Sequence, residues 1–312
     1  MAVSLVVILI GVAAGLVSGV VVASTSTPDL DDPHIQRNTI RRAIADHSLV
    51  RLVARAVPRR AGPALAEAIA IAAVLVVGGA VVIGITLAMI RTDTGLARID
   101  TPIAEWAAQN ASEGSTTVMR ELSKFGGTAY VVVAAVAVAV YSARRDRGRA
   151  AVLFVVVAMI GQFLVSNSIK WSVDRARPTL SNLTGFAGTS FPSGHAVAGA
   201  AVWTSVAFLL GRGRSRTVRG VLFGVAVGLG VIVAGTRVAL GVHWTTDVII
   251  GVVIGWAWFV ICALLFGGRR LQPADPVRVA REDTTSTPPA RRTPPRSRGS
   301  RWRSRIGRHS PS

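Results

Sequence analysis

Long runs of apolar residues, separated by short polar segments, dominate the chain. Seven uncharged stretches are candidates to cross the roughly 30 Å hydrocarbon core of a bilayer at about 1.5 Å per residue. The fifth is the shortest, and a start nearer to Phe191 would lengthen it. The pattern predicts an all-α polytopic membrane helix bundle with a six-helix core over residues 68–268 and one extra N-terminal helix over residues 1–23. The stretches are residues 2–23, 68–90, 125–143, 150–169, 196–211, 220–236 and 248–268.

Two polar segments flank this core. The end of the first apolar run, Val22-Ala23-Ser24, resembles a signal-peptide cleavage site, but no Lys or Arg precedes the run, which is long for a signal peptide. We interpret it as an uncleaved helix followed by a basic segment over residues 24–67.

The C-terminal segment has a different composition. From residue 267 the chain holds seven of its 14 prolines and twelve arginines. Such a composition cannot bury apolar surface, so residues 269–312 are predicted to form a disordered basic tail.

The composition supports a membrane protein and excludes several other classes. The chain of 312 residues is 51% hydrophobic and 16% charged, with a mean hydropathy of +0.50. Its net charge of +19 lies between apolar runs and is not gathered on a folded face, so we expect no nucleic-acid partner. The single cysteine, Cys262, supports neither a disulfide framework nor a cysteine-based metal site.

The distribution of basic residues predicts the orientation in the membrane. Residues 24–67, 144–149, 212–219 and the tail hold 27 of the 35 Lys and Arg residues, and the alternate segments hold eight. Because basic residues concentrate in cytoplasmic loops, the first set should be cytoplasmic. The N-terminus and residues 170–195 and 237–247 then face the outer side, and the C-terminal tail faces the cytoplasm.

These two outer segments nevertheless contain charged residues at helix ends, which favours a functional role. Lys170 ends the fourth span, and six residues separate it from Arg177-Pro178. Because Pro178 disfavours a helix at Arg177, we expect this arginine on a turn that folds back over Lys170. Each residue alone has an ordinary alternative, such as a lysine whose charge reaches the membrane interface.

The sequence Pro192-Ser193-Gly194-His195 directly precedes the fifth span. The free backbone N–H groups of a helix N-terminus, with the hydroxyl of Ser193 and the small Gly194, can cradle a phosphate. His195 in the first turn can donate a proton to a leaving oxygen. An ordinary helix cap by serine is the alternative.

Arg237 ends the sixth span, five residues separate it from His243, and Asp247 follows after three more. A His/Asp pair with i,i+4 spacing lies on one helical face, so Asp247 can hold one ring nitrogen and leave the other free to attack phosphorus. The pair also suits a metal, but no third ligand has metal-site spacing nearby.

The three blocks resemble the signature of the type 2 phosphatidic-acid phosphatase superfamily of lipid phosphate phosphatases, Lys-x6-Arg-Pro, Pro-Ser-Gly-His and Ser-Arg-x5-His-x3-Asp. Each fixed position matches except Thr236, which replaces serine and keeps the hydroxyl. The resemblance implies that His243 is the nucleophile, oriented by Asp247, and that His195 protonates the leaving group. It also implies phosphate-binding roles for Lys170, Arg177, Ser193, Gly194 and Arg237.

The resemblance therefore implies a membrane phosphatase that needs no metal or other cofactor. The expected substrates are a polyprenyl diphosphate, phosphatidylglycerol phosphate or phosphatidate. We rank the first slightly ahead because it is released on the outer face, and membrane lipids are the only other partners expected. A transporter or a lipid-binding scaffold is the alternative, since charges near helix ends suit it too. Neither needs a His/Asp pair, a second histidine at a helix start and three cations together.

Overall fold

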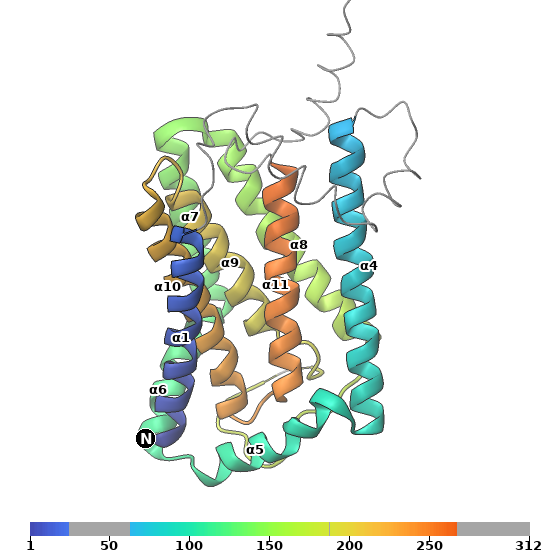
Figure 1. Cartoon of the computed structure of the whole chain (residues 1–312). Coiled ribbons are helices and arrows are strands. Elements are labelled where there is room, and N and C mark those ends of the chain that lie inside the picture. Colours follow the sequence, from blue (N-terminus) through green and yellow to red (C-terminus); the bar gives the residue numbers. More distant parts are fainter. Residues whose placement is uncertain (25–62, 187, 267–312) are drawn as a thin grey trace, which may run out of the picture.

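The computed structural model describes residues 1–24, 63–186 and 188–266. This described part is all helical, contains no strand, and forms a bundle of roughly parallel and antiparallel helices (Figure 1). The predicted basic segment lies mostly outside the described residues, and the predicted tail lies entirely outside them. The α-helices are α1 (Ala2–Ser24), α4 (Pro63–Thr92), α5 (Asp100–Gln109), α6 (Glu113–Ser123), α7 (Thr128–Ser142), α8 (Gly148–Ser172), α9 (Gly194–Leu210), α10 (Arg216–Ala239) and α11 (Thr245–Leu265).

Seven of these helices coincide with the seven predicted spans, so the prediction of an all-α membrane bundle is confirmed. Within the described ranges, six helices are long and apolar enough to cross a membrane, and α9 is a shorter apolar helix. Helix α9 contacts α7, α8, α10 and α11. It is therefore a central helix of the bundle, and most of its residues are buried.

Two further helices lie within residues 91–125, where the sequence predicted only a connection. Helix α5 runs across the end of the bundle that also carries the N-terminus, and α6 continues from it (Figure 1). Helix α6 begins in a capping box, in which Ser112 and Ser115 each bind the backbone N–H of the other. Both helices are too short and too polar to span a membrane, so the search for long apolar runs missed them.

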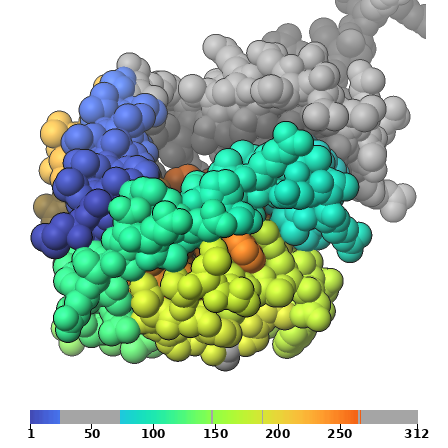
Figure 2. All heavy atoms as spheres, turned by 90° about the horizontal axis from the view of Figure 1, so that it is seen from below, coloured from blue at the N-terminus to red at the C-terminus, as the bar shows by residue number. Residues whose placement is uncertain are grey.

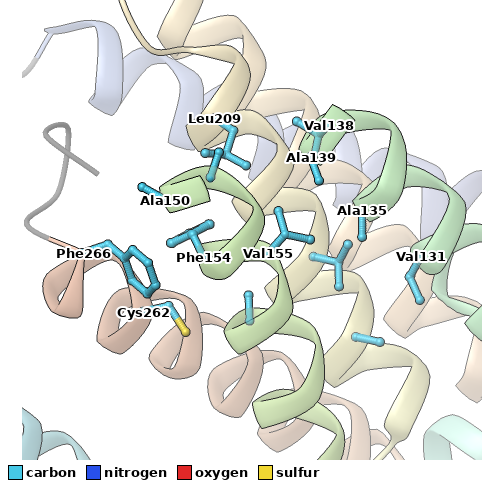
Figure 3. Packing of buried hydrophobic residues seen from close by; sticks show 14 residues of the cluster. Val131, Ala135, Val138, Ala139, Ala150, Phe154, Val155, Leu209, Cys262 and Phe266 are labelled. Atoms are coloured by element: carbon cyan, nitrogen blue, oxygen red, sulfur yellow. The ribbon is translucent and has the colours of Figure 1, made fainter. Parts of the chain in front are cut away.

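The core of the bundle is built mainly from small and branched apolar side chains. Figure 3 shows one buried cluster, in which Phe154 of α8 packs beside Cys262 of α11 and Phe266, which directly follows α11, next to side chains of α7 and α9. The rings of Phe154 and Phe266 meet edge to face, with their centroids 5.4 Å apart. Many other contacts are made by alanine and glycine, which let the backbones of membrane helices approach closely.

Helix α1 packs along α10 through glycines on both helices. Gly11, Gly15 and Gly19 of α1 face a matching row on α10, formed by Gly228, Gly224 and Gly220. A Cβ on Gly15 would lie 2.6 Å from the carbonyl oxygen of Gly224, which is closer than a side chain allows. The extra N-terminal helix is therefore fitted to α10 along its length and contributes to the packing of the bundle.

We expect Gly15→Leu to separate α1 from α10 and to destabilise the protein by about 1–3 kcal/mol, as overpacking of a close contact usually does. Gly84→Leu is the matched control, because a Cβ on Gly84 of α4 would meet nothing within 4 Å. Thermal unfolding of both variants in the same detergent checks this. Equal transition temperatures would contradict the close packing of α1 on α10.

Candidate active site

The predicted site residues lie at the end of the bundle where α5 crosses it. Two connections meet there, the loop of residues 173–193 between α8 and α9 and the turn of residues 240–244 between α10 and α11. Figure 2 views this end, where the yellow-green loop lies beside the blue-green α5 region and orange atoms of the α10–α11 region appear between them. The connections 143–147 and 211–215 lie at the opposite end (Figure 1).

Arg177 contacts several segments at this end. Its Nε atom donates to the carbonyl oxygen of Gly188 at 3.0 Å, and Nη2 donates to that of Thr189 at 3.1 Å. Its Nη1 atom donates to the carbonyl oxygen of Val242 at 2.6 Å and lies 3.1 Å from Nε2 of His243. The loop thereby places a guanidinium directly against one nitrogen of the histidine.

Lys170 reaches the same loop from the last turn of α8. Its Nζ atom donates to the carbonyl oxygen of Thr189 at 3.2 Å, the same oxygen that Arg177 contacts. Arg177 has no helical conformation, as the following proline predicted. The two cations are therefore brought together as the spacing in the sequence indicated.

His243 and Asp247 also meet, although not on one helical face. Helix α11 begins at Thr245, so His243 lies in the turn before it, and the expected helical pairing is wrong in this detail. The turn still places Nδ1 of His243 3.5 Å from Oδ2 of Asp247. The same oxygen accepts the N–H of Trp244 at 3.0 Å and the hydroxyl of Ser190 at 2.5 Å.

The imidazole of His243 is only 3% exposed. Burial lowers its pKa to about 4, although the carboxylate of Asp247 acts in the opposite direction. The ring is therefore neutral near pH 7. When Nδ1 carries the proton and faces Asp247, the lone pair of Nε2 points toward Arg177. A neutral imidazole held in this way can act as a nucleophile toward an anion bound at these cations.

The N-terminus of α9 forms a third wall of the site. Ser193 is the N-cap residue, and its backbone N–H donates to the carbonyl oxygen of Asp247 at 3.1 Å. Gly194 and His195 form the first turn, and a Cβ on Gly194 would lie 4.0 Å from Cε of Lys170. The unpaired N–H groups of this first turn thus lie beside a cation.

Arg237, in the last turn of α10, approaches from another side. Its side chain is 6% exposed, and Nη1 donates to the hydroxyl of Ser123 at 2.7 Å. Lys170, Arg177 and Arg237 all lie near His195. The structure therefore gathers the eight predicted site residues around one region.

In the described part of the site, Nδ1 of His243 makes no hydrogen bond and faces the Asp247 carboxylate at 3.5 Å, and two further buried polar atoms need a partner. Within the described ranges, neither the hydroxyl oxygen of Ser193 nor Nε of Arg237 has a hydrogen-bond partner. Buried polar groups are nearly always paired, so these two mark a place where a ligand with acceptor oxygens would fit. With Lys170 and Arg177 nearby, the ligand should be an anion.

The sequence did not assign a role to several residues that support this site. Arg175 contacts Asp247, Ser123 holds Arg237, and Ser190 binds the Asp247 carboxylate. Arg175 had one available signal, its position in a segment that the orientation rule predicts to be poor in basic residues. In the part of the chain that the structure describes, no group of three His, Cys, Asp or Glu side chains is placed to hold a metal ion.

Comparisons with known proteins agree with this geometry. The sequence profile of the PAP2 superfamily matches residues 151–271. The fold is similar to the crystal structure of a transmembrane PAP2-type phosphatidylglycerolphosphate phosphatase from Bacillus subtilis, with a TM-score of 0.53 and 22% sequence identity. That match covers 59% of this chain and 93% of the other. A search of curated proteins found no significant match.

We expect His243 to remain neutral well below the usual histidine range, because its burial lowers the pKa to about 4. Hydrogen–deuterium exchange at the C2 carbon of its ring, followed by mass spectrometry across pH 3 to 8, measures this value without any substrate. The midpoint should lie near 4 for His243. A midpoint near the unperturbed value of about 6.5 would show a solvated ring and contradict the site geometry.

Proposed function

We propose that this chain is a membrane phosphatase of the PAP2 superfamily, whose sequence profile matches residues 151–271, and that it hydrolyses a phosphate monoester or diphosphate of a membrane lipid through a phosphohistidine intermediate. The observation that carries the proposal is the placement of His243. Its Nδ1 lies 3.5 Å from the Asp247 carboxylate, and its Nε2 lies 3.1 Å from the Arg177 guanidinium. A nucleophile thus faces a group that binds phosphate oxygens.

The first chemical step transfers the phosphoryl group to the protein. Nε2 of His243 attacks phosphorus, the bond from phosphorus to the leaving oxygen breaks, and His195 donates a proton to that oxygen. Asp247 stabilises the positive charge that develops on the imidazole. In the second step water attacks phosphorus, His195 accepts a proton from the water, the bond between phosphorus and Nε2 of His243 breaks, and inorganic phosphate is released.

The remaining five residues bind the phosphoryl oxygens. Lys170, Arg177 and Arg237 supply positive charge, and the N-terminus of α9 supplies the hydroxyl of Ser193 and the N–H groups from Gly194 onward. The charge of a phosphoryl transition state is spread over three equatorial oxygens, so cations on several sides stabilise it most. This chemistry uses no metal ion, which is part of the proposal.

The substrate proposal comprises three lipids, a polyprenyl diphosphate, phosphatidylglycerol phosphate and phosphatidate. The Bacillus subtilis protein of similar fold is a phosphatidylglycerolphosphate phosphatase. All three substrates present the same terminal phosphoryl group to the site, and their leaving groups differ. Phosphate release from vesicles that contain each lipid, measured with the purified protein, would identify the substrate.

The two histidines should respond differently to substitution. His243→Ala should abolish turnover of every substrate, because each one needs the nucleophile. His195→Ala should lower phosphatidate hydrolysis by about 10²- to 10⁴-fold and p-nitrophenyl phosphate hydrolysis least, because the phenolate leaves without a proton. Steady-state rates for the lipid series and p-nitrophenyl phosphate measure this.

If His195→Ala lowers the hydrolysis of every substrate equally, His195 is not the general acid. If instead His195→Ala abolishes all turnover and His243→Ala shows the dependence on the leaving group, the two histidines exchange roles.

Wild-type activity should persist in EDTA and be inhibited by vanadate. Loss of activity on chelation, restored by magnesium, would refute the metal-independent mechanism.

We also propose that the site faces the outer side of the membrane, with the C-terminal tail in the cytoplasm. The support is the unequal distribution of basic residues, 27 against eight, between two sets of connections. The site loop and the N-terminus are at one end of the bundle, and the basic connections 143–147 and 211–215 are at the other (Figure 1).

Single cysteines at Asn182 and Ser215, introduced in a Cys262→Ala background, test this orientation. Both positions are exposed, and Cys262 is buried. An impermeant thiol reagent should label the Asn182→Cys protein in intact cells and the Ser215→Cys protein only after permeabilisation. Labelling of Ser215→Cys alone would reverse the orientation.

A further inference from the structure

The guanidinium of Arg175 lies between two buried carboxylates. Its Nη1 atom is 2.5 Å from Oδ1 of Asp247, and its Nη2 atom is 2.7 Å from Oδ2 of Asp100. The side chains of Arg175, Asp100 and Asp247 are 13%, 5% and 0% exposed. Asp100 lies outside the segment that matches the superfamily. Neither Asp100 nor Arg175 occupies a fixed position of the three sequence blocks.

Thr246 connects the two carboxylates through the start of α11. Oδ1 of Asp100 accepts the backbone N–H of Thr246 at 2.8 Å, and Oδ2 accepts its hydroxyl at 2.6 Å. Nη1 of Arg175 contacts the same hydroxyl oxygen at 2.7 Å. A carboxylate at a helix N-terminus is favourable, so Asp100 fixes the first turn of α11 to the start of α5. The residue after Thr246 is Asp247.

We propose that Arg175 and Asp100 form a positioning pair that orients the Asp247 carboxylate toward His243 and balances the charge behind it. This proposal rests on the proposed function, because it assigns the pair to the same nucleophile. Arg175 binds Oδ1 of Asp247, so Oδ2 is the oxygen directed at His243, Ser190 and the N–H of Trp244. Without Arg175 the carboxylate can rotate, and neither oxygen is fixed opposite the histidine.

The pair should also set the electrostatic field at His243. Asp100, Asp247 and Arg175 together carry one net negative charge, because two carboxylates surround one guanidinium. Arg175→Gln raises that negative charge to two, and Asp100→Asn reduces it to zero. The other ionisable groups that act on or lie close to His243 stay the same in both variants, namely Arg177 from the loop, Arg237 from α10, His195 from α9 and Lys170 from α8.

The two substitutions therefore have opposite effects on the protonation of His243. More negative charge stabilises the imidazolium, so Arg175→Gln raises the pKa of His243 and moves the acid limb of kcat/KM to higher pH. Asp100→Asn lowers this pKa and moves the acid limb to lower pH. A merely structural role would reduce the folded fraction in both variants and would not move the limbs in opposite directions.

Hydrolysis of p-nitrophenyl phosphate by the purified protein from about pH 2.5 to pH 9 tests this, a range that extends below the pKa of about 4 expected for His243 in the wild type. Arg175→Gln should lower kcat by roughly 10- to 100-fold with little change in KM, as is usual for groups that orient a catalytic side chain. Arg120→Gln is the matched control. Arg120 binds the carbonyl oxygen of Leu183 in the same loop, so it holds the loop without contacting the carboxylates. Its pH profile should match that of the wild type.

Exchange at the C2 carbon of His243 provides a readout that does not depend on turnover. The midpoint should rise in Arg175→Gln, fall in Asp100→Asn and stay constant in Arg120→Gln. If the midpoints of Arg175→Gln and Asp100→Asn shift in the same direction, or do not shift, the proposed role of the positioning pair is wrong even when the wild type is an active phosphatase. Opposite shifts in a protein that hydrolyses no lipid phosphate would support the pair's effect on charge and refute the proposed function instead.

Discussion

The carboxylate of Asp247 is completely buried where α11 begins, beside the apolar interior of the bundle. An isolated charge in such a place costs several kcal/mol, so it persists only when donors surround it. The donors come from parts of the chain that are far apart in sequence. Arg175 and Ser190 belong to the loop between α8 and α9, while Trp244 belongs to the turn before α11. Satisfying this one carboxylate therefore fixes the loop, the turn and the helix relative to one another.

Close helix packing makes this convergence possible. Gly251 of α11 faces the carbonyl oxygen of Ser193, where a Cβ would lie 2.9 Å away, and Gly255 faces that of Val197 one turn further along α9. Larger residues at these positions would separate α9 from α11 and break the bond between the Ser193 N–H and the Asp247 carbonyl. The proposed phosphate cradle at the start of α9 thus depends on small residues within the membrane-spanning part of α11.

The cations of the site are held in place before any anion binds. Backbone carbonyl oxygens of Gly188, Thr189 and Val242 accept hydrogen bonds from Arg177, and Thr189 also accepts one from Lys170. Neutral carbonyls orient these groups without cancelling their charge, as a carboxylate would. In the proposed reaction a bound phosphoryl group would meet donors that need little rearrangement, which is how fixed electrostatic sites stabilise a transition state.

The sequence alone predicted the seven helices, because an apolar run of sufficient length has one stable form in a membrane, in which the helix satisfies its own backbone. It also predicted that Lys170, Arg177, His195 and His243 lie together, because they occur in three blocks at helix ends.

Only the tertiary structure placed α5 across the site and brought Asp100 to the start of α11. No local pattern marks Asp100, since a single acidic residue in the first turn of a short polar helix is ordinary. Its partner Arg175 is 75 residues away. Hydrophobic periodicity determines which segments enter the membrane, whereas the pairing of buried charges depends on distances that exist only after the helices have packed.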